Sequence, residues 1–167
     1  KNWLEKILKF SKSKTLIGVT SSFSSHASNS FYRNKDENFF QFLKRFFLSN
    51  YYFNYFPNPH IRTACFLVNS NEFINFMSNS RTIESKFDAH ILESGKSGLT
   101  NYFLKRNFNV IIVNSDANKF SLINSKNSDT FSVNDQSKLL ISDKHSRIYK
   151  NSKAKQKMKI TKRVWGN

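Results

Sequence analysis

The sequence predicts an α/β fold: a three-layer sandwich of helices around a mostly parallel sheet, followed by a basic C-terminal extension. Two apolar runs, "TACFLVN" (63–69) and "NVIIVNSD" (109–116), have the length of strands that are covered on both faces. Segments with apolar residues at helical spacing lie between the runs, as in parallel strands joined by crossover helices. We therefore expect a reduced fold of the flavodoxin-like or Rossmann-like kind.

The N-terminal segment, residues 1–29, is expected to hold a helix and a serine-rich loop. In "WLEKILKF" (3–10) the apolar residues recur at helical spacing, which predicts a short amphipathic helix. The serine-rich stretch that follows reads mostly as loop, with one possible strand over 16–19.

Residues 30–142 carry the predicted α/β domain, and their clearest helix lies in "DENFFQFLKRFFLS" (36–49). Acidic residues at its start favour the positive end of a helix. Its apolar residues form one face that we expect to pack in the core: Phe39, Phe40, Leu43, Phe46 and Phe47. Pro57 and Pro59 end this element.

The remainder of this domain alternates between the two patterns. The spacing of apolar residues over 73–77 predicts a helix, and "KFDAHILES" (86–94) is a weaker candidate for a strand. The run over 109–116 is the strongest strand signal, because four branched residues follow one another. Beyond "FSVND" we expect a helix from Gln136 into the region of Ile148.

The charge of the chain points to a polyanionic partner. With 27 Lys and Arg against 11 Asp and Glu, the formal net charge is +16. Nucleic acid is the usual partner of such a chain, and an anionic membrane surface is the alternative. Between Lys138 and Asn167, Asp143 is the one acidic residue among ten Lys and Arg, and the tail over 150–167 shows no apolar face. The extension over 143–167 is either a solvated charge run or an RNA-binding segment that orders on its partner. We favour RNA, because the rest of the chain is basic as well.

Two groups of residues are candidates for RNA contact. The first lies in the extension: Lys150, Lys153, Lys155, Lys157, Lys159, Lys162, Arg163 and Trp165. The second lies near the N-terminus: Lys6, Lys9, Lys12 and Lys14. Trp165 could stack on a base or pack in a protein groove.

No catalytic or metal site is predicted. "GKSGLTNY" (95–102) resembles a phosphate-binding loop, but His90 stands where that loop needs its first glycine, and Glu93 would repel phosphate. The histidines at 26, 60, 90 and 145 show no metal-ligand spacing, and the single cysteine, Cys65, is expected to be a structural thiol. We expect neither an enzyme nor a cofactor, metal or small-molecule substrate.

Membrane-spanning segments are not expected either. The most aromatic stretch, 39–56, is interrupted by polar residues and cannot span a bilayer.

The residue usage, with 18 Phe against 4 Gly and 2 Pro, indicates a very AT-rich gene, as in many organelle genomes.

Four motifs, taken in order, resemble the family of small-subunit ribosomal protein two, in its bacterial and organellar branch. They are "FLVNSNEF", "SGKSGLTNY", "NVIIVNSD" and "FSVNDQS". Leu99, Thr100 and Asn101 match the family's Leu-Thr-Asn, and Asn134 and Asp135 match a later Asn-Asp. Between Asp116 and Phe131 the chain is too short for the family's helix plus strand, so one such unit is lost or supplied by a neighbour.

The resemblance implies a structural role in the small subunit of an organellar ribosome, where the chain binds ribosomal RNA and other small-subunit proteins. It implies location in the mitochondrial matrix, with another AT-rich organelle such as a plastid as the alternative. It also implies that Leu99 is core, that Thr100 and Asn101 satisfy backbone groups at a helix start, and that Lys96 contacts phosphate. Two other functions stay open: a peripheral protein of anionic membranes and a degenerate α/β nucleotide-binding enzyme.

Overall fold

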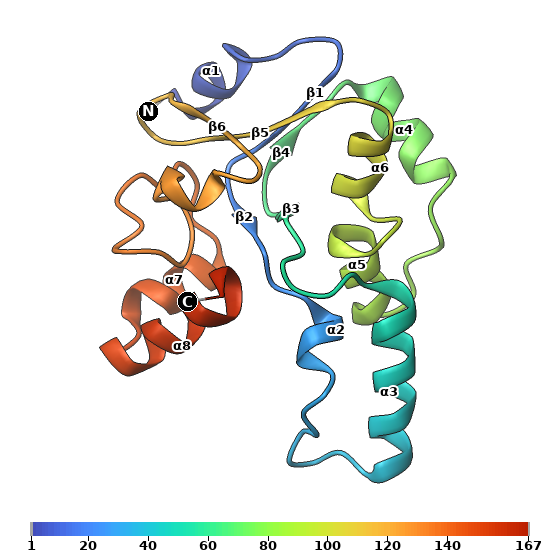
Figure 1. Ribbon diagram of the computed structural model, residues 1–167. Coiled ribbons are helices and arrows are strands. Elements are labelled where there is room, and N and C mark those ends of the chain that lie inside the picture. The colour runs from blue at the N-terminus through green and yellow to red at the C-terminus, as the bar shows by residue number, and fades with distance from the viewer. Residues whose placement is uncertain (1, 167) are drawn as a thin grey trace.

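The computed structural model describes residues 2–166, so Lys1 and Asn167, at the outer ends of the two predicted terminal segments, lie outside it. The chain is a mixed α/β structure, which confirms the predicted class (Figure 1). The helices are α1 (Trp3–Leu8), α2 (His26–Asn29), α3 (Phe39–Tyr52), α4 (Ser70–Ser78), α5 (Lys86–Ser94), α6 (Leu99–Lys105), the 3-10 turn η1 (Ser125–Ser128), α7 (Lys144–Asn151) and α8 (Ala154–Trp165). The strands are β1 (Thr15–Gly18), β2 (Ser21–Ser22), β3 (His60–Ile61), β4 (Phe66–Leu67), β5 (Asn109–Val113) and β6 (Lys119–Ser121).

The main sheet has the strand order β4-β1-β5-β6 and is mixed. Its central pair, β1 and β5, is parallel, with Ile17 opposite Ile111. Both outer pairings, β1 with β4 and β5 with β6, are antiparallel, where the sequence predicted mostly parallel pairing. The reason is local: β6 returns directly after β5, and β4 is a short edge strand. A second small sheet pairs β2 with β3.

The central strands are buried because their side chains alternate between two apolar clusters. Val110 and Ile112 face one cluster, which contains Phe76 of α4 and Phe103 of α6. On the other face, Ile17, Val19, Ile111 and Val113 form a cluster with Ile7 of α1, and Leu140 and Ile141 pack against it. The sheet is therefore covered on both sides.

Several predicted elements are confirmed, and two strand predictions need correction. The helices at 3–10 and 73–77 and the strands at 16–19 and 109–116 are present as α1, α4, β1 and β5. The predicted strand at 63–69 shrinks to β4, a half-buried edge pair of residues, Phe66 and Leu67. The prediction of a strand at 86–94 is wrong, because this segment is α5.

The sequence contains the signal for α5. The Ser85 hydroxyl accepts a hydrogen bond from the Asp88 amide, and the Asp88 carboxylate accepts one from the Ser85 amide. This reciprocal capping box satisfies backbone donors at the helix start. Phe87 and Ile91, one turn apart, then pack on the cluster around Phe53.

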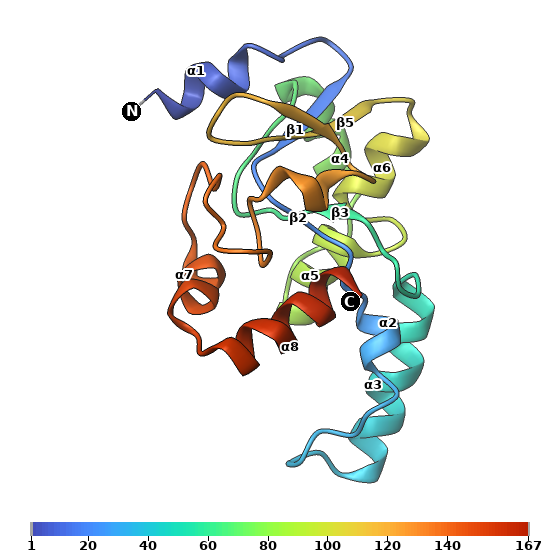
Figure 2. The ribbon, with the colours of Figure 1, turned by 60° about the vertical axis from the view of Figure 1, so that its left-hand side comes forward.

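The helix predicted in 36–49 is present as α3, but the prediction that its aromatic face lies in the core is wrong in part. Phe39, Phe40 and Phe47 are exposed, Phe40 to 81%. The helix projects away from the sheet in two views, and α2 runs alongside it (Figures 1 and 2). Only the side of α3 that faces the rest of the chain is covered.

The C-terminal region is also folded differently from the expectation. The helix expected from Gln136 begins only at Lys144, where the Asp143 side chain caps α7. Between Asp116 and Phe131, where the chain was expected to be too short for a helix plus strand, the described chain holds β6 and η1.

The extension does have an apolar face. Ile160, Val164 and Trp165 of α8 pack on Phe131 and Val133. Lys157 shares this side of the helix, which hid the pattern in the sequence. No helix of residues 2–166 has the length and apolar character needed to cross a membrane.

Candidate functional site

A basic surface extends over the end of α7 and along α8. Six predicted RNA-contact residues are exposed and have no acidic group within 4.0 Å in the described part of the chain: Lys150, Lys153, Lys155, Lys159, Lys162 and Arg163. Lys155, Lys159 and Lys162 lie on one helical face, because they are four and three residues apart. We call these six residues the α8 basic surface. Lys157 differs from them, because it is half-buried and its ammonium lies 3.3 Å from the Asp135 carboxylate.

Trp165 anchors α8 to the body. Its side chain is buried, its indole Nε1 donates to the Phe131 carbonyl at 3.0 Å, and its ring meets Phe23 edge-on at 5.1 Å. The ring therefore packs in a protein groove, the second of the two roles considered for it, and offers no free face for a base.

The N-terminal lysines lie at the other end of the molecule from α8 (Figures 1 and 2). Lys9, Lys12 and Lys14 are exposed. Lys6 is half-buried and donates to the Ser115 carbonyl. The structure therefore does not join the two predicted groups into one surface.

Lys96 and the Leu-Thr-Asn motif connect parts of the fold. The Lys96 ammonium donates to the Asn50 carbonyl at 3.0 Å, which ties the loop before α6 to the end of α3. Leu99 is fully buried, as the resemblance implied. Thr100 accepts from the Ile61 amide at 2.9 Å, and Asn101 donates to the Gly95 carbonyl at 2.8 Å. These two side chains thus satisfy β3 and the end of α5 rather than the start of α6, whose cap residue, Gly98, has no side chain.

The Asn-Asp motif holds the C-terminal helices. The Asn134 carbonyl accepts from the Tyr149 hydroxyl at 3.1 Å, and the Asn134 side chain donates to Asp129 at 3.2 Å. Asn134 has a positive φ of 45°, as do its neighbours Ser132 and Gln136. This kinked segment places Asp135 where it meets Lys157.

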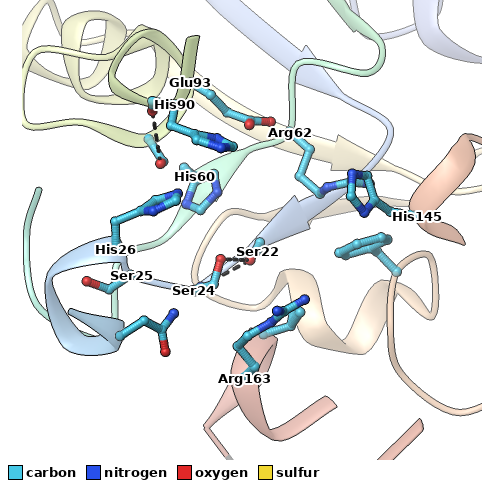
Figure 3. Close-up of a pocket in the computed structure, with 14 residues that line it drawn as sticks. Ser22, Ser24, Ser25, His26, His60, Arg62, His90, Glu93, His145 and Arg163 are labelled. Carbon is cyan, nitrogen blue, oxygen red and sulfur yellow. Dashed lines mark hydrogen bonds between the residues drawn. The ribbon is translucent and has the colours of Figure 1, made fainter. Parts of the chain in front are cut away.

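All four histidines of the chain line one pocket, which their spacing in the sequence does not predict (Figure 3). They come from four elements: His26 from α2, His60 from β3, His90 from α5 and His145 from α7. The pocket has a volume of about 310 Å³ and also contains Arg62, Arg163 and the serines after β2. No periodicity could have signalled it, because each histidine lies in a different segment and the fold alone brings them together.

Burial favours the neutral form of three imidazoles in this pocket, those of His26, His60 and His90. Burial, together with the nearby imidazoles of His90 and His60, lowers the pKa of His26 to about 4. Burial also lowers the pKa of His60 and of His90. The ring of His26 lies 4.5 Å from that of His90 and 4.7 Å from that of Phe53. His60 donates from Nδ1 to the Asn58 carbonyl at 2.7 Å, which leaves Nε2 as an acceptor in the neutral ring.

Within residues 2–166 no three His, Cys, Asp or Glu side chains are arranged to hold a metal ion. Cys65 lies apart, half-buried against the sheet, and burial raises the pKa of its thiol.

A second groove, of about 390 Å³, continues from the pocket along α8. It is lined by Lys159, Lys162 and Phe56. Ser25, Asn29 and Arg163 border both hollows. The α8 basic surface and the histidine pocket are therefore contiguous.

Comparisons of the chain with protein-family models, curated proteins and solved structures found no match.

Proposed function

We propose that this chain binds RNA through the α8 basic surface and serves as a structural protein of the small subunit of a mitochondrial ribosome. The observation that carries the proposal is the set of six exposed cationic side chains without acidic partners. Counterions condensed on RNA are released when such side chains approach phosphates, which drives binding without base reading. The ribosomal assignment is supported by the ordered motifs, and we regard the fold as a reduced relative of the flavodoxin-like arrangement.

The geometry favours phosphate recognition by shape. Three lysines on one face of a helix that is anchored by Trp165 form a rigid row of point charges. A rigid row loses less conformational freedom on binding than a flexible tail does. The groove beside it, of about 390 Å³, is lined by Lys159 and Lys162, and single-stranded segments are what proteins mostly read in RNA.

Gradient sedimentation of organelle lysate, with and without ribonuclease, tests this function. We expect the chain to travel with the small subunit and to be released by ribonuclease. A chain that stays at the top of the gradient in both samples contradicts the proposal.

A second candidate function is attachment to an anionic membrane surface. The observation that favours it is on α1, where Trp3, Leu4 and Leu8 are exposed beside Lys9. Such a helix can lie in the interface with its apolar side in the lipid. Flotation with anionic vesicles, unchanged by ribonuclease and lost in Trp3→Ser, would favour this function over RNA binding.

A further inference from the structure

The histidine pocket has the charge and donors of an anion site. Arg163 stands at its rim without an acidic partner in the described chain. Glu93 is the only acidic side chain among the lining residues, and it is already engaged: its Oε1 accepts from the Thr63 amide at 2.7 Å and from the Thr63 hydroxyl at 3.3 Å. Thr63 is uncharged, so the Glu93 charge remains, and the lining residues carry two arginines, Arg62 and Arg163, against this one carboxylate.

Arg62 adds a donor that the protein itself does not use. Its Nη2 lies 2.8 Å from the Asp143 carboxylate, and its guanidinium stacks 3.8 Å above the centre of the Phe131 ring. Its Nη1 is buried and has no hydrogen-bond acceptor in the described chain. An unused buried donor costs stability, so its presence beside a polar pocket calls for an explanation. A small movement of this side chain would give Nη1 to an anion.

Serine hydroxyls complete the donor set. The hydroxyls of Ser22 and Ser24 lie 2.8 Å apart and bond to each other, so one of the two protons remains free to be donated. Figure 3 shows both serines opposite the histidine cluster, on the side of Arg163. Hydrogen-bond donors thus approach the pocket from β2, from α8 and from the loop after β2. This arrangement suits the oxygens of a phosphate, which point in different directions.

We propose that this pocket binds a phosphate ester, and that in the RNA-bound protein the ester is a backbone phosphate of a single-stranded segment. The second part rests on the proposed RNA-binding function. The strand would continue from the pocket along the groove of Lys159 and Lys162, which shares Arg163 with the pocket. At about 310 Å³, the pocket is at the lower limit for a ligand site and suits a phosphate with part of its sugar or base.

Binding should be linked to proton uptake. His26 faces His60, His90, Glu93 and Arg163, and burial with those imidazoles lowers its pKa. Lys86 and His145 also lower the pKa of His90, and Arg62 lowers the pKa of His60. A phosphate anion among these groups favours the charged imidazoles, so affinity should rise as the pH falls below neutrality.

The four histidines make the test direct, because every imidazole signal in a proton NMR spectrum of the full chain reports on this pocket. The probes are inorganic phosphate, adenosine monophosphate and a single-stranded RNA oligonucleotide without terminal phosphates. We expect all three to shift the imidazole signals. If none shifts them at millimolar concentration, the proposal is overturned.

A matched pair of variants separates charge from shape. Ser24→Asp puts a carboxylate in the pocket, and Ser24→Asn puts a neutral group of the same size there. We expect each probe to bind at least tenfold more weakly to Ser24→Asp than to Ser24→Asn. Equal affinities would overturn the proposal. Should the Ser24 variants misfold, Arg163→Gln provides the test, with Arg106→Gln, just after α6, as its control, because both arginines are exposed.

The probes also separate the pocket from the proposed function. If the oligonucleotide binds equally well to both Ser24 variants, RNA binding stands and the pocket proposal falls. If phosphate and the mononucleotide bind in the pocket but the oligonucleotide does not bind at all, the phosphate site stands for a free nucleotide and the RNA function falls.

Discussion

The imidazole rings of His26 and His90 lie 4.5 Å apart, at an interplanar angle of 39°, although they belong to different helices. Two protonated rings at this distance would repel each other in a partly buried site. Folding therefore favours the neutral rings, and the stability of the chain depends on pH.

The first prediction is a loss of stability in mild acid. The pKa of His26 falls from 6.5 to about 4 on folding, so between these values the unfolded chain binds more protons than the folded one. The stability that folding gains from the neutral His26 is fully present above pH 6.5. It is lost as the pH falls toward 4, which lowers the free energy of unfolding by at most about 3 kcal/mol. Urea unfolding at several pH values in this window measures it. His26→Phe keeps a ring against Phe53 and should flatten the dependence; an equally steep acid loss in this variant would contradict the assignment.

The second prediction concerns α3. Phe40 is 81% exposed, so Phe40→Ser should change the free energy of unfolding by no more than about 0.5 kcal/mol. Phe53, just after the helix, is fully buried, and Phe53→Ala should cost about 3–5 kcal/mol. Urea midpoints of the two variants compare the positions directly. A cost at Phe40 similar to that at Phe53 would show that the aromatic face is core after all, as the sequence suggested.

The third prediction concerns the sharp turn before α6. A Cβ on Gly98 would lie 2.6 Å from the Ile91 carbonyl oxygen and 2.9 Å from that of Leu92. Backbone atoms cannot move aside as a flexible side chain can, so Gly98→Ala should destabilise the fold by about 1–3 kcal/mol. Ser97→Ala, at the exposed neighbouring position, is the control and should be neutral. Thermal unfolding followed by circular dichroism compares the two variants. A Gly98→Ala variant as stable as Ser97→Ala would contradict this prediction.

The fourth prediction concerns the α8 basic surface. Replacing Lys155, Lys159 and Lys162 with Gln removes three phosphate contacts. The slope of log affinity against log salt for single-stranded RNA should fall by about 2, at roughly 0.7 per contact. The control replaces Lys9, Lys12 and Lys14 at the opposite end of the molecule. A larger loss in the control than in the α8 variant would move the RNA site to the N-terminus.

The central elements of the fold could be predicted from the sequence, but the peripheral ones could not. The run of branched residues in β5 and the helical spacing of apolar residues in α4 were sufficient to predict these two elements. In each of them the apolar pattern in the sequence matches the side that is buried. The apolar residues of the α5 segment favour a strand, but the Ser85–Asp88 capping box marks a helix start. The aromatic face of α3 was assigned to the core because spacing alone cannot show whether a helix has a neighbour.

The candidate site could also be predicted only in part. The lysines of α8 could be found from composition, because charge needs no tertiary structure to be counted. The histidine pocket could not, since α2, β3, α5 and α7 each contribute one ring and only folding brings them together. The sequence leaves two roles open for Trp165, stacking on a base or packing in a protein groove, and only its partner in the fold, the Phe131 carbonyl, decides between them.

The fifth prediction follows from that anchor. Trp165→Ala removes a buried ring and leaves the Phe131 carbonyl without its donor, so the free energy of unfolding should fall by about 3–5 kcal/mol. Trp165→Phe retains much of the packing and loses only the hydrogen bond, at a cost of about 1–2 kcal/mol. If α8 must be docked for its lysines to form a rigid row, Trp165→Ala should weaken RNA binding although it removes no charge. Filter binding at fixed salt, with Trp165→Phe as the control, measures this effect. Unchanged RNA affinity in Trp165→Ala would mean that the lysines act as a flexible tail, and that docking of α8 serves the fold alone.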